Sequence, residues 1–375
     1  MTNRVMRPIG CSLFVPLVMG ILLTTGCSSG PSGSEVTSLD ETAALEQVDT
    51  VEIQETDERF IGELADADIE LDPLRIYVAD RKMQRVAVIT ADGSIDHFIG
   101  EAGRGPGELG RPIFLSVDED RVVVAQRRWR GFSVFDTSGT PIDNHRLPGE
   151  HYVGGYDLFQ IRDGYVMPIS SFSPQRMGSL RVPSGENTVA TLNDTFEVEE
   201  TFGTFPSLYR DGEYYSQQRT MDLRADSLAA VGYRLVPNVR LYDLTRQGDP
   251  HLQTLSFDHP DFRPPQEETP LDIAIDDELY ERLANYDIVE ETMLLQDDIV
   301  VQVFANHTKG YYKQTEFKPS EQEHFATLGT IDSDERLPLS LPGPVLARDE
   351  KDRLYVELNP TPDNRKIGIY EVNWP

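Results

Sequence analysis

Basic side chains gather in a small number of loops, and such loops could bind an anionic ligand. A planar guanidinium hydrogen-bonds both oxygens of a carboxylate or phosphate, and a neighbouring indole can stack on a sugar ring or a peptide. Four of the six lysines also fall in loops of this kind, namely Lys82, Lys309, Lys313 and Lys366. The residues that form this candidate ligand site are Arg81, Lys82, Arg104, Arg127, Arg128, Trp129, Arg130, Arg365 and Lys366. The alternative is that these exposed arginines only balance nearby carboxylates such as Asp80 and Glu108.

The sequence lacks the common motifs for metal-dependent or nucleophilic catalysis. None of the seven histidines forms a His-x-x-x-His or His-Glu-x-x-His pair, and there is no Gly-x-Ser-x-Gly elbow and no phosphate-binding loop. We therefore predict no catalytic residue, no metal ligand and no cofactor. The rival prediction is an enzyme in which scattered polar residues such as Asn306, His307 and Glu357 approach a central channel.

Short apolar strands separate the basic loops and repeat at a regular interval. The segments RIYVAD and RVAVIT indicate a hairpin, and a shift of 46 residues places 76–79 on 122–125 and 86–89 on 132–135. A period of this length with four strands per unit predicts an all-β fold, namely a β-propeller of four-stranded antiparallel blades. A β-sandwich is the alternative, but it gives no reason for the period.

The tetrapeptide Phe-Ile-Gly-Glu occurs at 60–63 and again at 98–101, and it suggests how the ring closes. The last repeat stops after its third strand. We therefore expect an N-terminal strand around Arg59–Gly62 to complete the C-terminal blade, which leaves no bare sheet edge. The chain length alone allows seven blades, but an acidic insertion at about 259–288, with a short helix at Asp276–Tyr286, favours six.

The alternating strand directions place the basic loops on one face of such a ring. Each strand of a blade reverses direction, so the loop after the second strand and the crossing to the next blade emerge together. The basic loops all belong to these two kinds. We therefore predict a cationic rim around one mouth of the central channel, suited to an anionic ligand or an acidic partner surface.

The N-terminus has the features of a secretory signal. Arg4 and Arg7 precede an apolar run at 9–23, which is too short and wrongly flanked for an ordinary membrane span. We assign residues 1–26 to a signal peptide.

The end of this signal, LLTTGCSSG, resembles the lipobox of bacterial lipoproteins. Cys27 would be the lipidated cysteine, although Thr24 stands where that motif usually has leucine. Ser28 then implies release to the outer membrane, facing the periplasm or the cell surface, and acyl chains would hold the protein to the bilayer. The polar segment 27–50 is predicted to be a flexible tether and 51–375 the propeller. The alternative is an ordinary secretory signal with a chance cysteine.

A second resemblance lies in the repeats. The segment IGEAGRGPGELGRP, followed by RVVVAQ and FSVFDTSG, resembles NHL-type repeats. The chain is similar over 56–146 and 343–375 to six-bladed β-propeller lipoproteins of Gram-negative bacteria, a resemblance that implies a fold and a compartment but no single reaction. Some propeller lactonases and lyases hold a metal in the channel, which makes a metal-dependent hydrolase or lyase the rival function.

The charge balance narrows the possible partners. The formal net charge is −30, which argues against binding to a nucleic acid backbone. Both cysteines lie near the start, so the body of the protein has no disulfide. An acidic, lysine-poor chain also predicts adaptation to high salt, with a merely acidic periplasmic protein as the alternative. We predict a lipid-anchored monomer that acts as a binding or scaffolding module for an envelope protein or an anionic glycan.

Overall fold

The computed structural model describes residues 44–118, 120–126, 131–148, 151–171, 186–214, 217–246, 248–269, 277–307, 322–359 and 364–374. The predicted signal peptide, most of the predicted tether, Cys27 and the basic loop at 127–130 lie outside these ranges. No helix in the described part of the chain is long and apolar enough to cross a bilayer.

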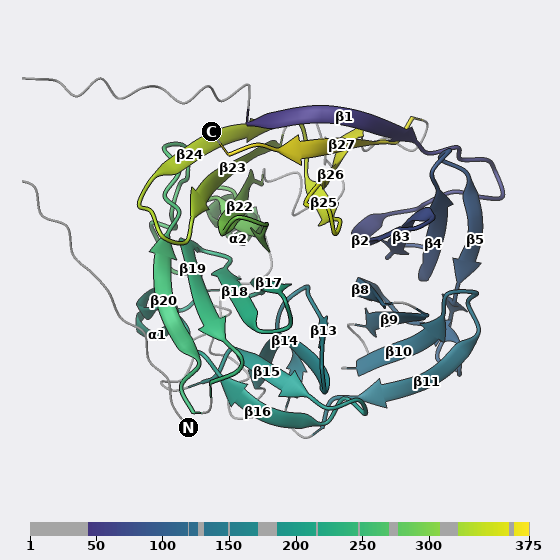
Figure 1. Cartoon of the computed structure of the whole chain (residues 1–375), viewed down its shortest axis with the longest axis horizontal. Coiled ribbons are helices and arrows are strands. Elements are labelled where there is room, and N and C mark those ends of the chain that lie inside the picture. The colour runs from purple at the N-terminus through teal and green to yellow at the C-terminus, as the bar shows by residue number, and fades with distance from the viewer. Residues whose placement is uncertain are drawn as a thin grey trace, which may run out of the picture. The chain divides into compact units, whose positions relative to one another are not determined.

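Six antiparallel sheets surround a central axis, so the predicted six-bladed propeller is confirmed (Figure 1). From the axis outward, blade 1 contains β2 (Leu64–Leu71), β3 (Leu74–Asp80), β4 (Arg85–Thr90) and β5 (Ile95–Ile99). Blade 2 contains β8 (Pro112–Asp118), β9 (Arg121–Gln126), β10 (Gly131–Asp136) and β11 (Pro141–Arg146). Blade 3 contains β13 (Phe159–Ile161), β14 (Gly164–Ser171), β15 (Val189–Leu192) and β16 (Val198–Phe202), and β12 (His151–Val153) also pairs with β14.

The remaining three blades follow in chain order. Blade 4 contains β17 (Arg219–Arg224), β18 (Leu228–Tyr233), β19 (Val236–Asp243) and β20 (His251–Ser256). Blade 5 contains β21 (Ile288–Leu294), β22 (Ile299–Asn306), β23 (Glu323–Thr330) and β24 (Arg336–Leu341). Blade 6 contains β25 (Val345–Arg348), β26 (Leu354–Asn359), β27 (Lys366–Val372) and, outermost, β1 (Leu45–Glu52).

The hydrophobic core is divided among the interfaces between neighbouring blades. In β3, Ile76 and Val78 pack toward blade 6, whereas Tyr77 and Ala79 pack toward blade 2. All four side chains are fully buried. Because the second strand of a blade is buried on both faces, its sequence is a continuous apolar run, and the equivalent run in β9 recurs at the predicted interval.

Short elements outside the blades fill the gaps between them. The crossing from blade 1 to blade 2 contains β6 (Glu101–Ala102) and β7 (Glu108–Leu109), which pair in parallel. Helix α1 (Ser207–Asp211) precedes blade 4, and α2 (Asp277–Leu283) lies in the segment predicted to be an insertion. Leu279 and Leu283 of α2 are buried in the core that joins blades 3 and 4.

An N-terminal strand completes blade 6, as predicted, but the predicted position of that strand is wrong. β1 pairs antiparallel with β27, from Leu45 opposite Val372 to Glu52 opposite Lys366 (Figure 1). The strand therefore begins inside the segment assigned to the tether, and the segment at 59–62 is not a strand of blade 6. As an outermost strand, β1 is mostly exposed and polar, so its sequence looks like a linker.

The first Phe-Ile-Gly-Glu copy lies beside blade 1 instead. The buried Asp80 carboxylate accepts a hydrogen bond from the Gly62 N–H at 2.8 Å. The Arg85 guanidinium lies 5.6 Å from the centre of the Phe60 ring and 3.4 Å from that of Phe98. The two copies thus meet at one cation rather than occupying equivalent positions in two blades.

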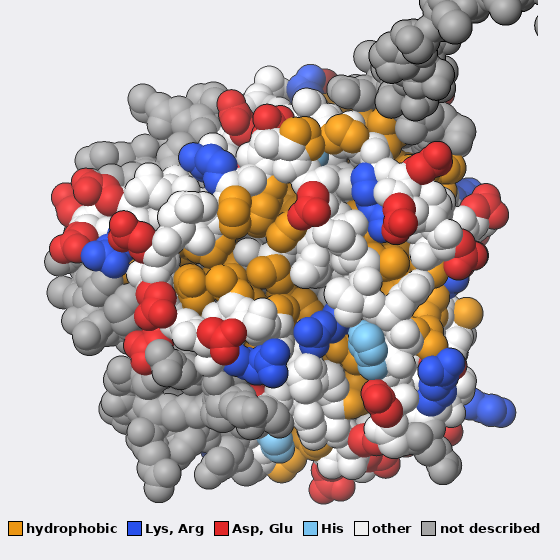
Figure 2. Space-filling model, turned by 90° about the vertical axis from the view of Figure 1, so that its left-hand side faces the viewer, with side chains coloured by type: hydrophobic (Ala, Val, Ile, Leu, Met, Phe, Trp, Pro, Cys, Tyr) orange, Lys and Arg blue, Asp and Glu red, His pale blue; other side chains and the backbone are white. Residues whose placement is uncertain are grey.

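The outer side of the ring that carries β20 and β24 has no large single-sign patch among its described residues. Figure 2 shows apolar side chains across the middle of this side, Asp and Glu mainly toward its edges, and Lys and Arg scattered singly. This side of the ring does not show the dense acidic surface that adaptation to high salt would produce, and that adaptation stays a prediction.

Candidate functional site

The described members of the predicted cationic rim are placed on separate loops, and several form ion pairs within the chain. Arg81 lies 3.1 Å from a carboxylate oxygen of Glu63, and the Lys366 ammonium pairs with Glu52. Two further members have exposed side chains, Lys82 and Arg104. Arg81, Lys82 and Arg365 all lie against the segment 61–63, and the remaining rim residues at 127–130 lie outside the described ranges.

Arg365 is buried rather than exposed at a rim. Its side chain is 4% exposed and contacts Glu55 at 3.3 Å and Glu357 at 3.1 Å. It also donates a hydrogen bond to the backbone oxygen of Ile61 at 3.1 Å. Arg365 therefore ties the N-terminal segment to blade 6 and is not positioned to contact a ligand.

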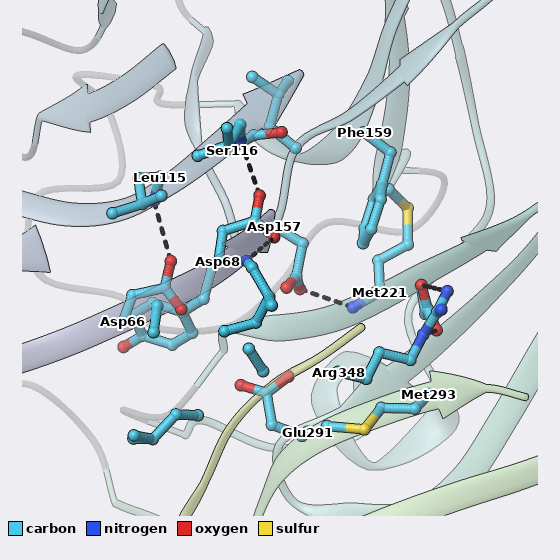
Figure 3. A pocket seen from close by; sticks show the side chains of 18 of the residues that line it. Asp66, Asp68, Leu115, Ser116, Asp157, Phe159, Met221, Glu291, Met293 and Arg348 are labelled. Atoms are coloured by element: carbon cyan, nitrogen blue, oxygen red, sulfur yellow. Dashed lines mark hydrogen bonds and ion pairs between the residues drawn. The ribbon is translucent and has the colours of Figure 1, made fainter. Parts of the chain in front are cut away.

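A cavity of about 290 Å³ lies on the axis and receives side chains from all six blades (Figure 3). Its lining residues come from the inner strands, from the segment before β13 and from the turn after β25. The charged residues of the lining are Asp66, Asp68, Asp118, Asp157, Asp222, Glu291, Arg348, Asp349 and Glu350. The cavity is thus predominantly acidic.

Several of these aspartates join the inner strands of neighbouring blades. The Asp66 carboxylate accepts the Leu115 N–H at 2.9 Å, and Asp157 accepts the Met221 N–H at 2.7 Å (Figure 3). Asp68 accepts from Val117 in the same way, at 2.7 Å. The innermost strand of each blade has a free edge, so these carboxylates satisfy N–H groups that no further strand reaches.

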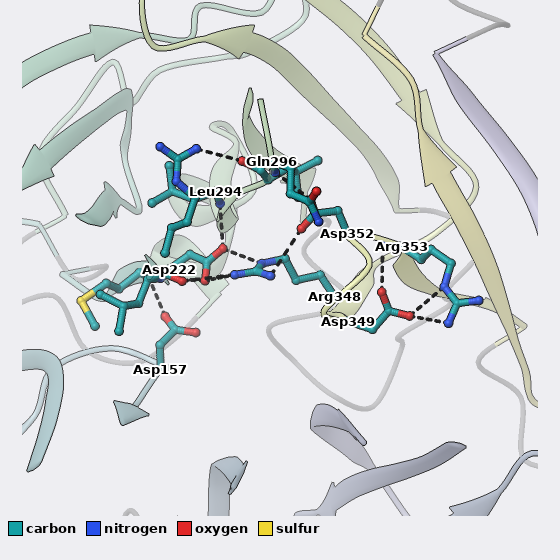
Figure 4. Close-up of polar contacts among 12 residues, drawn as sticks. Asp157, Asp222, Leu294, Gln296, Arg348, Asp349, Asp352 and Arg353 are labelled. Atoms are coloured by element: carbon teal, nitrogen blue, oxygen red, sulfur yellow. Dashed lines mark hydrogen bonds and ion pairs between the residues drawn. The ribbon is translucent and has the colours of Figure 1, made fainter. Parts of the chain in front are cut away.

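One cation belongs to the cavity wall. Arg348 of blade 6 reaches across to Asp222 of blade 4 and forms two bonds of 2.7 and 2.9 Å (Figure 4). Asp222 also accepts the Leu294 N–H of blade 5 at 2.7 Å, and Asp352 lies 3.6 Å from Arg348. This planar pair links three blades and neutralises Asp222.

Asp66, Asp68, Asp157 and Glu291 form no ion pair with any residue that the structure describes, whereas Asp349 pairs with Arg353 at 2.6 Å. Burial raises the pKa of Asp157 to about 8 and that of Asp68 to about 6, against the opposing effect of their backbone hydrogen bonds. Burial also raises the pKa of Asp66 and of Glu291 well above the usual range, and the neighbouring carboxylates raise both further. Such groups either hold a proton or attract a cation at neutral pH.

A second cluster of titratable groups lies in blade 5. Glu290 accepts hydrogen bonds from His307 Nε2 at 2.8 Å and from His324 Nδ1 at 3.1 Å. Burial acts to raise the pKa of Glu290, but these bonds and the two imidazoles outweigh it, so the pKa is lowered. Glu357, named in the rival metal-site prediction, bonds Arg365 instead. In the part of the chain that the structure describes, no three His, Cys, Asp or Glu side chains are grouped so that they could hold a metal ion.

The fold and its axial cavity define the chain as a six-bladed β-propeller. No protein-family model matches the chain, and no curated protein matches it. It is similar to the crystal structure of a member of the DUF4221 family from Bacteroides vulgatus, with a TM-score of 0.66, 10% identity, and coverage of 88% of this chain and 98% of that one. A putative exported protein from Bacteroides fragilis gives a TM-score of 0.59 at 11% identity, with 90% and 98% covered. At these identities the likeness shows the fold alone.

Sequence reasoning did not find the cavity residues, although a signal was present. The first strands of three repeats carry acidic residues between apolar ones, in LADADIEL, TMDLR and IVEETML. This alternation is typical of a strand with one exposed face. The acidic residues can be assigned to one site only when the six inner strands are known to face one another across the axis.

Proposed function

We propose that this chain is a binding module of the cell envelope, and that its ligand places a positively charged group in the central cavity. The observation that carries the proposal is a set of four half-buried carboxyl groups that face one cavity: Asp66, Asp68, Asp157 and Glu291. A nearby cation stabilises carboxylates in such surroundings. An ammonium group has three N–H donors and can therefore serve several of these oxygens at once.

We propose a cationic ligand in place of the anionic ligand predicted from the sequence. The reason is that rim arginines already bond carboxylates within the chain, whereas cavity carboxylates have unused acceptor positions. The described rim arginines Arg81 and Arg365 already bond carboxylates of the chain. By contrast, the Glu291 carboxylate has no hydrogen bond to any residue that the structure describes, and Asp66 and Asp157 bond a neighbouring blade through one oxygen each. An anionic ligand or acidic partner at the loops stays a prediction. A metal-dependent hydrolase or lyase has less support, because two of the polar residues named for it have other partners: His307 bonds Glu290, and Glu357 bonds Arg365.

Calorimetric titration with butylamine tests the cavity, with butanol as the neutral probe of the same shape. We expect butylamine to bind and butanol not to bind, at a pH near the raised value of about 8 for Asp157. Asp157→Asn keeps an oxygen for the Met221 N–H but removes the charge, so it should weaken butylamine binding about tenfold. Equal binding of the two probes, or an unchanged affinity in Asp157→Asn, would contradict the proposal. Asp57→Asn, a change at an exposed bend that does not line the cavity, is the matched control.

We also propose that acyl chains on Cys27 hold the module to a membrane, as the lipobox resemblance implies. Each buried methylene contributes about 0.8 kcal/mol to membrane binding, so a multiply acylated cysteine anchors the protein stably. We expect the intact protein to sediment with membranes and enter a detergent phase, and Cys27→Ser to be recovered in the aqueous phase. Membrane association of Cys27→Ser equal to that of the unaltered protein would rule out this anchor.

A further inference from the structure

A second cavity opens beside the first, between blades 2 and 3. It has a volume of about 390 Å³ and is lined by three turns, those between β8 and β9, between β13 and β14, and between β15 and β16. Asp118 and Gln160 line both this groove and the central cavity. The two spaces are therefore neighbours that share a wall, and one ligand could occupy both.

The groove differs from the central cavity in its chemistry. It combines two arginines, Arg121 and Arg162, with four aspartates, Asp118, Asp120, Asp163 and Asp194. Arg162, Asp163 and Asp194 are exposed, and no ion pair or hydrogen bond joins their side chains to other described residues. The groove thus presents charged donors and acceptors side by side, whereas the charged side chains of the central cavity are all carboxyl groups except Arg348.

We infer that the ligand is the N-terminal segment of a peptide, with its α-ammonium group in the central cavity and its following residues in the groove between blades 2 and 3. This inference rests on the proposed function, because it takes the axial carboxylates as the site for the charged group.

The mixed lining of the groove decides between linear ligands. An extended peptide backbone alternates N–H donors with C=O acceptors, so aspartates and arginines can both bond it. A polyamine carries only positive donors along its length, so it could bond the aspartates but offers Arg121 and Arg162 no acceptor. A polyanion would be repelled by the aspartates of the groove and by the carboxylates of the central cavity. Of these three chains, the peptide is the one that both spaces accept.

The test compares the affinity of a short and a long probe, alaninamide and the amidated peptide Ala-Ser-Ala-Ser, by calorimetric titration of the full chain. We expect the longer peptide to bind about tenfold more tightly than alaninamide. Arg162→Ala should bring the ratio of the two affinities close to one. Arg246→Ala, a change at another exposed arginine on the same face, should leave the ratio as it is.

The possible failures are distinguishable. Equal affinities for the two probes would overturn the peptide assignment, and so would a ratio that Arg162→Ala and Asp194→Ala both leave unchanged. In either case, loss of alaninamide binding in Asp157→Asn would still support the axial site. Tighter binding of spermidine than of the peptide would overturn the assignment as well. If Asp157→Asn binds alaninamide as tightly as the unaltered protein, the proposed function fails and the peptide inference fails with it.

Discussion

Replacement of Arg365 with Met is expected to lower the free energy of unfolding by about 3–5 kcal/mol. The guanidinium is almost fully buried and bonds two carboxylates, those of Glu55 and Glu357. Its loss would leave both acids in a buried site without a counter-charge. Burial already raises the pKa of Glu357, and Arg365 is the main side chain that opposes this shift. Urea unfolding with linear extrapolation measures the effect.

The adjacent lysine provides the control for this prediction. Lys366 pairs with Glu52 between β27 and β1, but the two side chains are 32% and 67% exposed, so Lys366→Met should cost at most about 1 kcal/mol. A triple variant with Arg365→Met, Glu55→Gln and Glu357→Gln should recover much of the loss, because no buried charge remains. If Arg365→Met and Lys366→Met cost the same, the buried network does not stabilise the closure of the ring.

The repeat made the architecture predictable from the sequence. The second strands of the blades are buried on both faces, so they keep the same apolar run at each repeat, and Ile76 and Val122 fall in second strands of consecutive blades. The missing fourth strand of the last repeat predicted closure by the N-terminus, which β1 provides. These features survive in the sequence because packing between blades allows few polar substitutions.

The closing strand itself was misplaced for a physical reason. β1 lies at the outer edge of blade 6, where only Val51 is fully buried and Val48 is 42% exposed. A strand with so little buried surface has the composition of a linker. The segment at 60–63 looked like a strand because it repeats the end of β5, yet its backbone is held by Asp80 rather than by a neighbouring strand.

The candidate site was less predictable than the fold, because it is made by residues far apart in the chain. Asp222 and Arg348 are 126 residues apart, and no local pattern pairs them. Basic residues stood out in an acidic sequence and drew attention to the loops. The acidic residues of the inner strands are a few of 64 carboxylates in the chain. Only the convergence of the six blades on one cavity distinguishes them from the acidic residues of the surface.

Replacement of Asp157 with Asn is expected to stabilise the protein, by an amount that grows with pH. The pKa of Asp157 is raised from 3.8 to about 8 in the folded protein, first by burial and further by the Asp222 carboxylate. Between these values the folded state holds a proton that the unfolded chain releases, so the stability that depends on Asp157 falls as pH rises through this window. Asn does not ionise and still accepts the Met221 N–H. We expect a gain of roughly 2 kcal/mol near the upper end of the window and almost none below its lower end.

The pH dependence separates ionisation from packing in this variant. A gain that is equal at both ends of the window would show that Asn packs better than Asp, and the carboxyl group would then not be strained by its charge. Asp163→Asn removes a carboxylate from an exposed turn close by and should leave the stability unchanged at both ends. Butylamine added near the upper end should stabilise the unaltered protein more than Asp157→Asn, because the ligand supplies the positive charge that the cavity lacks. The stability gain of Asp157→Asn without ligand and the smaller stabilisation of this variant by butylamine therefore both report on the charge of Asp157.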